Sequence, residues 1–331
     1  MKNTTVRLAQ RPEGAIDDNT FAIQSEPVAE LGEGEIRVAV EYVSVDPAMR
    51  TWLSDFESYV PPVAINEVMR AGGIGEIIES RSPDFSAGDK VQGLFGAQRI
   101  YSGPPVGVMR LDSSGVAIQH YLGGAGGTGF AAYFGLLNVG VMKEGDVVVV
   151  SAAAGAVGHI AVQIAKLKGN RVIGIAGGIE KCRQVVEEYG ADACIDYKSE
   201  DVGARMAELC PDGIDVYFDN VGAEILENAM DNLAMYARIV ICGAISEYDN
   251  LETMHAPRNY INLIGRHARM EGFVTFHYAK QYREARAELL QWHGEGKLQF
   301  RDQIEEGIEN FPDILKMLFE GRNSGKLLVR V

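Results

Sequence analysis

The first third of the chain alternates apolar and polar positions in the way that is typical of β-strands. Residues 35–45 (EIRVAVEYVSV) are rich in β-branched side chains, and Gly73–Glu79 and Lys90–Phe95 are shorter segments of the same kind. Turn-forming residues such as Gly32-Glu33-Gly34 separate these segments, and helical periodicity is poor throughout. We therefore predict an antiparallel, barrel-like β domain at the start of the chain.

After Tyr121 the pattern changes to apolar runs that alternate with helical segments. Val147–Val150 is entirely apolar, as expected of a buried parallel strand, and the next segment carries a helical apolar face from Val157 until Gly169 closes it. Alternating strands and helices predict a doubly wound α/β domain, a parallel sheet with helices on both faces. Further strands are predicted at Arg171–Ala176, Ala193–Asp196, Ile214–Asp219 and Arg238–Cys242, and further helices at Thr128–Asn138, with Thr128 as its cap, and Glu180–Tyr189.

The last part of the chain mixes the two patterns again. A long helix is predicted at Ala279–Glu295, a strand at Leu298–Ile304, a helix at Phe311–Phe319 and a final strand at Lys326–Val331. We expect this tail to pair back with the first β domain, which would make that domain discontinuous in sequence. The predicted divisions are residues 1–125, 126–296 and 297–331.

Composition narrows the class of protein. The 31 Lys and Arg against 46 Asp and Glu give a formal net charge of −15, which argues against a protein that binds nucleic acid or an anionic membrane. The four cysteines form no CxxC pair, so reduced thiols are expected. The first residues lack the apolar region of a signal peptide, and no apolar stretch is long enough to span a membrane. A cytoplasmic protein is therefore expected.

One segment has the features of a phosphate-binding turn. The strand Val147–Val150 runs into Ser151-Ala152-Ala153-Ala154-Gly155-Ala156-Val157-Gly158 and then directly into a helix. This approximates the GxGxxG pattern, with Ala153 at the first glycine position. Gly155 would let the backbone approach a pyrophosphate, Gly158 would let helix and strand pack closely, and the helix N-terminus would supply N–H donors. The alternative is a tight turn of small residues that binds nothing.

The second strand of such a domain indicates which dinucleotide is bound. NAD-binding domains carry an acidic residue there for the ribose 2′-hydroxyl, but this chain has Ala176-Gly177-Gly178, and Lys181 follows. Small residues leave room for a 2′-phosphate, and an ammonium group can pair with it. We therefore expect NADP(H) rather than NAD(H). The alternative for Lys181 is an ordinary solvated helix lysine.

These residues, taken with several other segments, resemble the zinc-free medium-chain dehydrogenase/reductase family, in the branch of the prostaglandin (leukotriene B4 12-hydroxydehydrogenase) and curcumin reductases. The resemblance covers nearly the whole chain. It rests on SVDPAMR (Ser44–Arg50), TGFAAYFGLL (Thr128–Leu137), AAAGAVG (Ala152–Gly158), QIAKLKG (Gln163–Gly169), EKCR (Glu180–Arg183), FDNVG (Phe218–Gly222), RIVICGAISEY (Arg238–Tyr248) and NSGKLLVRV (Asn323–Val331). Relatives usually read VDPYMR where this chain has Ala48, which bears on the substrate more than on the cofactor.

The resemblance implies a fold, a cofactor and a set of site residues. The fold would be a discontinuous GroES-like β-barrel catalytic domain around a central Rossmann domain, with NADP(H) in the cleft between them. The pyrophosphate would lie on the phosphate-binding turn, the 2′-phosphate between Lys181 and Tyr197, and the ribose and nicotinamide against Asn220 and three further segments. Those segments are the loop Cys242, Gly243, Ala244, Ile245, Ser246, Glu247 and Tyr248, the strand end Phe273, Val274 and Thr275, and Asn323.

The chemistry expected is reduction of a carbon–carbon double bond without a metal. The chain lacks the cysteine and histidine sets of zinc-dependent relatives, so no metal ligands are assigned. In a conjugate reduction, hydride adds to the β-carbon of an α,β-unsaturated ketone or aldehyde, and hydrogen-bond donors stabilise the enolate oxygen. Tyr248, which follows a buried strand, and Tyr59, in a proline-stiffened loop, are the candidate donors. For each, the alternative is a purely structural role.

Two other functions stay open on the sequence. A quinone oxidoreductase would transfer hydride to a quinone, and a sensor or structural protein would bind NADPH without consuming it. A small-molecule substrate is expected in either enzyme, with no nucleic acid or membrane partner. Relatives are often dimers joined through the Rossmann sheet, so the resemblance also implies a homodimer.

Overall fold

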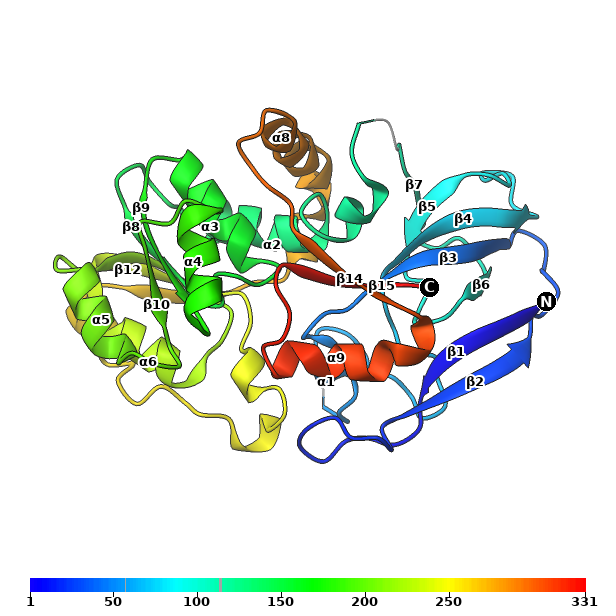
Figure 1. The fold of residues 1–331 in the computed structure, drawn as a ribbon, viewed down its shortest axis with the longest axis horizontal. Coiled ribbons are helices and arrows are strands. Elements are labelled where there is room, and N and C mark those ends of the chain that lie inside the picture. The colour runs from blue at the N-terminus through cyan, green and yellow to red at the C-terminus, as the bar shows by residue number, and fades with distance from the viewer. Residues whose placement is uncertain (57, 113–114) are drawn as a thin grey trace. The chain divides into compact units, whose positions relative to one another are not determined.

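The computed structural model describes residues 1–56, 58–112 and 115–331. Within these residues the chain divides into two compact units, and each is built from separate parts of the sequence (Figure 1). The first comprises residues 1–122, 302–323 and 327–331, and the second comprises residues 123–301 and 324–326. The first unit has an antiparallel sheet and the second a parallel one, so the predicted α/β class with a discontinuous β domain is confirmed.

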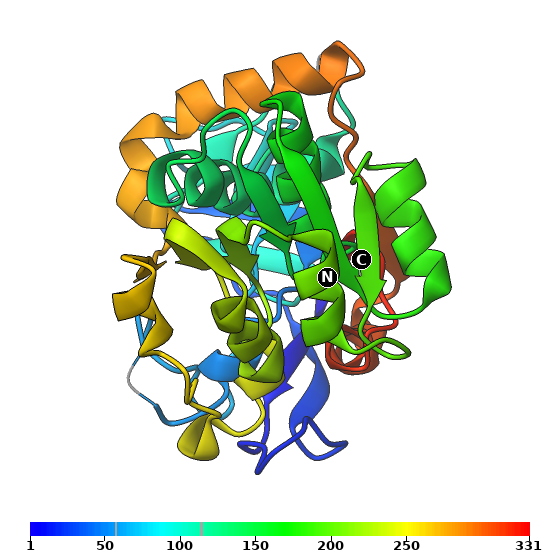
Figure 2. The same cartoon turned by 90° about the vertical axis from the view of Figure 1, so that its left-hand side faces the viewer.

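The second unit is organised around a parallel sheet. Among the described residues it has six strands in the spatial order β10-β9-β8-β11-β12-β13, which is the Rossmann arrangement in which the strand order reverses between β8 and β11. The strands are β8 (Val147–Val150), β9 (Arg171–Ala176), β10 (Ala193–Asp196), β11 (Ile214–Asp219), β12 (Leu233–Ile241) and β13 (Arg269–Gly272). Figure 2 shows this unit from the side that faces left in Figure 1.

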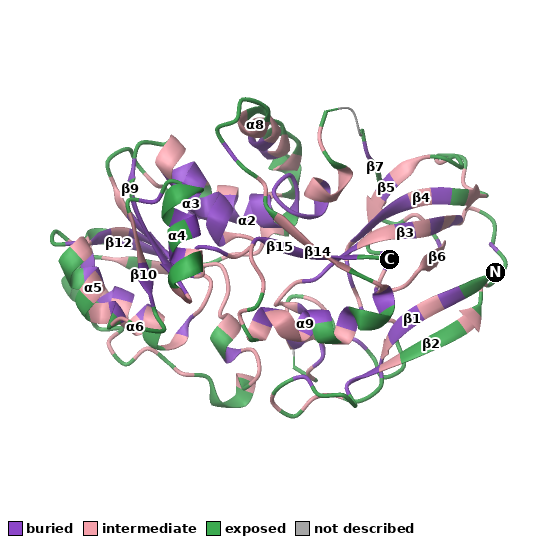
Figure 3. Ribbon diagram, viewed as in Figure 1, coloured by how far each residue is buried: buried purple, intermediate pink, exposed green. Residues whose placement is uncertain are grey.

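Side chains that alternate along these strands pack against helices on both faces of the sheet. Val148 and Val150 of β8 join a core with α3 and α4, whereas Val149 and Tyr217 join a second core with α5 and α6. The burial colours of Figure 3 show both cores as purple strands between helices with green outer faces. The helices are α2 (Gly127–Phe134), α3 (Gly158–Leu167), α4 (Ile179–Glu187), α5 (Val202–Leu209), α6 (Ala223–Asp231), α7 (Asn262–Gly265) and α8 (Tyr282–Gly294).

The first unit is built around an antiparallel sheet in which the spatial order of the strands differs from their order in the sequence. Strand β3 is its centre, because it pairs with β4 on one edge and with both β6 and β15 on the other. The elements are β1 (Lys2–Leu8), β2 (Phe21–Pro27), β3 (Ile36–Ser44), α1 (Met49–Trp52), β4 (Gly73–Ser80), β5 (Lys90–Gly93), β6 (Ile100–Gly103), β7 (Met109–Arg110), β14 (Asp302–Glu306), α9 (Phe311–Phe319) and β15 (Lys326–Arg330). No helix within the described ranges is both long and apolar enough to cross a membrane.

The return segment reaches both units. Phe311 and Leu315 of α9 lie in the core of the first unit, and Leu328 of β15 is paired with Ser44 of β3. Residues 324–326 instead belong to the second unit, where Gly325 N–H donates to Ala154 O at 2.9 Å. In the structure, the C-terminal segment of the first unit therefore begins at Asp302, whereas residue 297 was predicted. Residues 324–326 divide this segment into two parts, because they belong to the second unit.

Two expected elements differ from the structure. Helix α2 begins at Gly127 with Gly126 as its N-cap, so the expectation that Thr128 caps it was wrong; the turn from Gly123 O to Gly126 N–H starts the helix earlier. The predicted strand Leu298–Ile304 begins only at Asp302. The residues before Asp302 do not pair with a strand here, because their N–H groups donate to other elements. Leu298 N–H donates to Trp292 O, and Gln299 N–H donates to the Gln163 side chain.

The role of α9 in the first unit can be tested with one pair of leucines. Leu315 is fully buried and Leu94 is 69 % exposed. We expect Leu315→Ala to lower the free energy of unfolding by about 2–5 kcal/mol, because it leaves a cavity in the core. The same change at Leu94 should alter it by no more than about 0.5 kcal/mol. Urea denaturation of both variants measures this, and equal losses would contradict a core role for α9.

Candidate functional site

The carboxyl ends of the parallel strands bring most of the predicted site residues to one edge of the second unit. Strand β8 ends before Ser151, β9 before Gly177, β11 at Asp219 and β12 before Cys242. Because all these strands run in parallel, their ends meet where ligands bind in open α/β sheets, at the point where the strand order reverses. The pyrophosphate turn, Asn220 and the Cys242–Tyr248 loop therefore lie on the same edge.

The turn between β8 and α3 has the close packing predicted for a phosphate-binding turn. A Cβ atom at Gly158 would lie 2.2 Å from Ala152 O, so no larger residue fits there without moving the backbone. Ala153, at the position of the missing glycine, is fully buried and its N–H donates to Ile175 O of β9. The turn leads directly into α3, whose N-terminus carries the positive end of the helix dipole; in its first turn, His159 N–H donates to Gly155 O and Ala161 N–H donates to Val157 O.

The side chain of His159 contacts the backbone of this turn. The sequence did not indicate this role. The imidazole is 1 % exposed, with Nδ1 2.8 Å from Gly155 O and Nε2 accepting from Arg301 N–H at 3.3 Å. Since one ring nitrogen accepts, the other is the donor to Gly155, which assigns the neutral tautomer. The ring thus ties the phosphate-binding turn to the segment at Arg301.

The end of β9 has Gly177 where an NAD-binding domain carries an acidic residue, and the Tyr197 side chain would have to move to admit a larger residue there. A Cβ atom at Gly177 would lie 2.7 Å from the hydroxyl oxygen of Tyr197, because the tyrosine ring packs over this glycine. The nearby carboxylate of Asp196 is already used: it accepts from Gly178 N–H at 2.7 Å, from Lys198 N–H at 3.0 Å and from the Ser199 hydroxyl at 2.8 Å. These bonds hold the pKa of Asp196 below its usual range.

The ammonium groups of Lys181, in α4, and Lys198, directly after Tyr197, are close enough for their charges to interact. The pKa of Lys181 is lowered, first by partial burial and second by the positive charge of Lys198. Two like charges that interact favour an anion. Lys181 also lines a hollow of about 360 Å³ whose charged side chains are of both signs: Arg183 and Arg301 on one hand, and Glu180, Glu187 and Glu188 on the other. Sequence reasoning did not include Lys198. Its position directly after Tyr197, at the end of the neighbouring strand, was the available signal.

A buried hydrogen-bond cluster fixes the ends of β8 and β11. Asp219 Oδ1 accepts from the hydroxyls of Ser151 and Tyr217, both at 3.0 Å, and from Val221 N–H and Gly222 N–H. Burial raises the pKa of Asp219, and these donors oppose that effect. The side-chain amide of Asn220 donates to Ser151 O at 2.7 Å, so its orientation is set by the same cluster.

The Cys242–Tyr248 loop is bound to the turn that follows β11. Cys242 N–H and Gly243 N–H both donate to Asp219 O, and Ile245 N–H donates to Asn220 O. The Tyr248 hydroxyl accepts from Ala244 N–H at 3.1 Å, which is the structural role left open on the sequence. A phenol that accepts such a bond keeps its O–H as a donor, so a catalytic role stays a prediction. Burial raises the pKa of Cys242 to about 12, so this thiol is not a nucleophile at neutral pH.

The remaining predicted residues are distributed over both units. Phe273, Val274 and Thr275 follow β13, and the Phe273 ring packs against the core of the second unit. Tyr59 and Asn323 belong to the first unit, where Tyr59 is half exposed. Their roles stay predictions.

The described residues fit the expected dinucleotide. The backbone at Gly158 leaves no room for a side chain, the end of β9 carries Gly177 rather than an acidic residue, and Lys181 and Lys198 supply two positive charges that interact. Together they provide donors for a pyrophosphate and cations for a third phosphate. For a metal, no group of three or more His, Cys, Asp or Glu side chains suited to hold one occurs in the described part of the chain.

Comparison with known proteins gives full-length matches. Two family models match, one for the N-terminal domain of oxidoreductases over residues 4–111 and one for zinc-binding dehydrogenases over residues 156–291. The NADPH-dependent curcumin reductase of Escherichia coli is 38% identical over 98% of this chain and 95% of its own length. Prostaglandin reductase 1 of Bos taurus is 33% identical over 95% of this chain and 94% of its own length. The crystal structure of CurA from Vibrio vulnificus in complex with NADPH matches with a TM-score of 0.94 and 38% identity, over 99% of each chain.

The assignment of Lys181 to a 2′-phosphate predicts a selective loss of affinity. We expect Lys181→Ala to weaken NADPH binding about tenfold or more, because a charge-assisted bond to phosphate contributes about 1.5–3 kcal/mol. NADH, which lacks this phosphate, should bind about as before. Isothermal titration calorimetry with both dinucleotides measures the difference. Lys168→Ala, at the C-terminal end of α3, is the matched control. Equal weakening of NADPH and NADH would contradict the assignment.

Proposed function

This chain belongs to the zinc-free medium-chain dehydrogenase/reductase family, in the branch of the curcumin and prostaglandin reductases, and on that premise we propose that it reduces the carbon–carbon double bond of α,β-unsaturated ketones and aldehydes. It is an NADP-dependent oxidoreductase. For the cofactor, the observation that carries the proposal is the end of β9, where Gly177 stands in place of an acidic residue and the charges of Lys181 and Lys198 interact; for the reaction, the support is the similarity to the curcumin and prostaglandin reductases.

The mechanism assigns separate tasks to the residues at the strand ends. When bound, NADPH supplies the hydride that reduces the β-carbon of the substrate. The phosphate-binding turn at Gly155–Gly158 and the cations Lys181 and Lys198 hold the two ends of the adenosine half. The Asp219 cluster fixes the turn at Asn220 and, through it, the Cys242–Tyr248 loop, so the nicotinamide half meets a rigid surface.

Tyr248 is the hydrogen-bond donor that we assign to the substrate. Its oxygen accepts from Ala244 N–H, which fixes the phenol and makes its proton a better donor. When negative charge develops on the carbonyl oxygen of the substrate, this O–H stabilises it. Tyr59, from the first unit, is the second proposed donor, on the family resemblance alone. Asn323 is assigned to the nicotinamide on the same ground.

The proposal extends to a homodimer joined through the open edge of β13. Within the part of the chain that the structure describes, this strand pairs with β12 and has no strand on its other side. The segment that precedes it in sequence carries apolar side chains that are well exposed, Tyr260 at 65 %, Ile261 at 64 % and Ile264 at 75 %. An open sheet edge and exposed apolar groups favour a second copy of the chain, because both surfaces are costly to leave in water.

The proposed activity is tested by measuring NADPH oxidation over a panel of enals, enones and quinones. We expect turnover of enals and enones, with the double bond rather than the carbonyl reduced in the product. EDTA should leave the rate unchanged, since no metal takes part. Turnover of quinones alone would replace the proposal by a quinone oxidoreductase. Binding of NADPH without turnover of any compound would indicate a sensor or structural protein, and a loss with EDTA that zinc restores would contradict the metal-free mechanism.

The role of Tyr248 has its own test. We expect Tyr248→Phe to lower kcat for an enone by about 10²-fold, as removal of a donor to a developing oxyanion does in other enzymes. NADPH affinity should change little, because the ring remains. Steady-state kinetics and calorimetry measure the two quantities, with Tyr236→Phe, at a residue 68 % exposed to which no role is assigned, as the matched control. An unchanged kcat would remove Tyr248 from the mechanism.

A further inference from the structure

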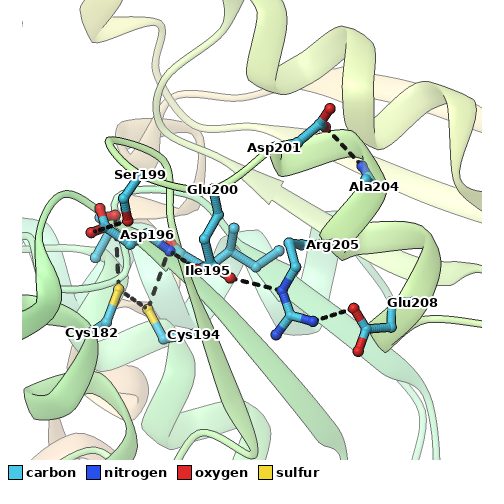
Figure 4. A network of polar contacts seen from close by, with 11 residues as sticks. Cys182, Cys194, Ile195, Asp196, Ser199, Glu200, Asp201, Ala204, Arg205 and Glu208 are labelled. Carbon is cyan, nitrogen blue, oxygen red and sulfur yellow. Dashed lines mark hydrogen bonds and ion pairs between the residues drawn. The ribbon is translucent and has the colours of Figure 1, made fainter.

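Two of the four cysteines lie side by side next to the site for the 2′-phosphate. Cys182 is in the first turn of α4 and Cys194 is in β10, 12 positions apart in sequence, and their sulfur atoms are 3.1 Å apart (Figure 4). The other polar atoms near them are more distant: Ala176 O is 3.9 Å from Cys182 Sγ, and Ile195 O is 4.0 Å from Cys194 Sγ. Each sulfur is thus the other's main polar neighbour, although both cysteines are reduced.

This pair connects the two sides of the phosphate site. Cys182 directly follows Lys181, whereas Cys194 leads through Asp196 to Tyr197 and Lys198. Asp196 binds both sides, because its carboxylate accepts from Gly178 N–H before α4 and from Lys198 N–H after β10. A further bond from Asp196 N–H to Glu200 fixes the loop after β10 (Figure 4). A covalent link between the two sulfurs would therefore act on the cations that are assigned to the 2′-phosphate.

We propose that Cys182 and Cys194 form a reversible disulfide under peroxide, and that this disulfide weakens the binding of NADPH. A disulfide needs an S–S distance of about 2.05 Å, so the two sulfurs must approach by about 1 Å. Bond formation does not depend on the proposed function, whereas its effect on NADPH rests on that function.

The chemistry balances with hydrogen peroxide as the two-electron oxidant. The thiolate of Cys182 attacks one peroxide oxygen, the O–O bond breaks, and the hydroxide that leaves takes up a proton to become water. The sulfur of Cys194 then attacks the sulfenic acid, the S–O bond breaks, and the departing oxygen leaves as a second water with the proton of Cys194. Two thiols and one peroxide thus give one disulfide and two water molecules.

The geometry indicates which sulfur reacts first. Burial raises the pKa of both thiols, but the S–H of Cys194 points to Cys182 and opposes the rise there, while the same contact raises the pKa of Cys194 further. Cys182 also lies in the first turn of a nine-residue helix, whose positive end favours a thiolate. Cys182 is therefore the attacking thiol, and Cys194 is the resolving one.

The link is detected by peptide mapping without reduction. After treatment with hydrogen peroxide and digestion with trypsin, we expect the peptide Cys182–Arg183 joined to Gln184–Lys198, with a mass lower than the sum of the two by two hydrogen atoms. The Cys182→Ser and Cys194→Ser variants should lack it, and Cys210→Ser, whose thiol lies at the end of α5, should retain it. Two outcomes would overturn the proposal. One is sulfinic acid at either cysteine without the linked peptide. The other is that both cysteines stay reduced at a peroxide concentration that oxidises free glutathione.

The effect on the cofactor is measured by calorimetry of the same samples. We expect oxidised protein to bind NADPH about fivefold more weakly, with NADH affected less, and dithiothreitol to restore the reduced value. By reciprocity, NADPH should slow formation of the disulfide. A linked peptide with unchanged NADPH affinity would overturn the second half of the proposal. Reduced protein that fails to bind NADPH would instead refute the proposed function, and peptide mapping would still decide whether the disulfide forms.

Discussion

The buried carboxylate of Asp219 holds together the edge of the sheet on which the site is built. It lies at the end of β11 and is 1 % exposed. Its side chain binds Ser151 after β8, and its backbone oxygen binds the first residues after β12, so three neighbouring strands end in one hydrogen-bonded unit. A carboxylate in such a place is costly unless donors surround it. The hydroxyls and N–H groups of the cluster all donate to Oδ1, whereas Oδ2 is buried without a hydrogen-bond partner, in keeping with a pKa that burial raises. The positions of Asn220 and Tyr248 both follow from this unit.

The sequence predicts the parallel domain better than the antiparallel one, for a physical reason. Strands such as Val147–Val150, Arg171–Ala176 and Ile214–Asp219 are buried on both faces, so their apolar runs end where the strands end, and the structure gives the same bounds. In the first unit, pairing is set by distant partners. Strand β3 joins β15 across nearly the whole chain, and the short strands β6 and β7 carry no local pattern that marks them. The first strand pair, β1 and β2, was not predicted for the same reason, because no local pattern marks its strands.

The residues of the candidate site fall into the same two groups. Some belong to a local sequence motif, and others depend on contacts that only the folded structure shows. Gly155, Gly158 and Lys181 could be proposed as cofactor-binding residues because each follows a strand end within a known pattern. Lys198 and His159 could not, since their significance depends on what the fold brings near them: a second ammonium group, and the carbonyl of Gly155. Tyr248 shows the limit most clearly. The sequence places it at the correct strand end, but only the structure shows that its oxygen accepts a bond from Ala244.

The late pairing of β15 with β3 has a consequence for synthesis of the protein. Tyr42 and Arg330 are 288 positions apart, so a ribosome makes nearly the whole polypeptide before the edge of β3 at Tyr42–Ser44 can be covered. Until then the nascent β unit exposes an open strand edge of the kind that drives aggregation. The parallel sheet, whose strands follow one another closely, can fold during translation. The antiparallel unit, in contrast, cannot complete its sheet until β15 has been synthesised.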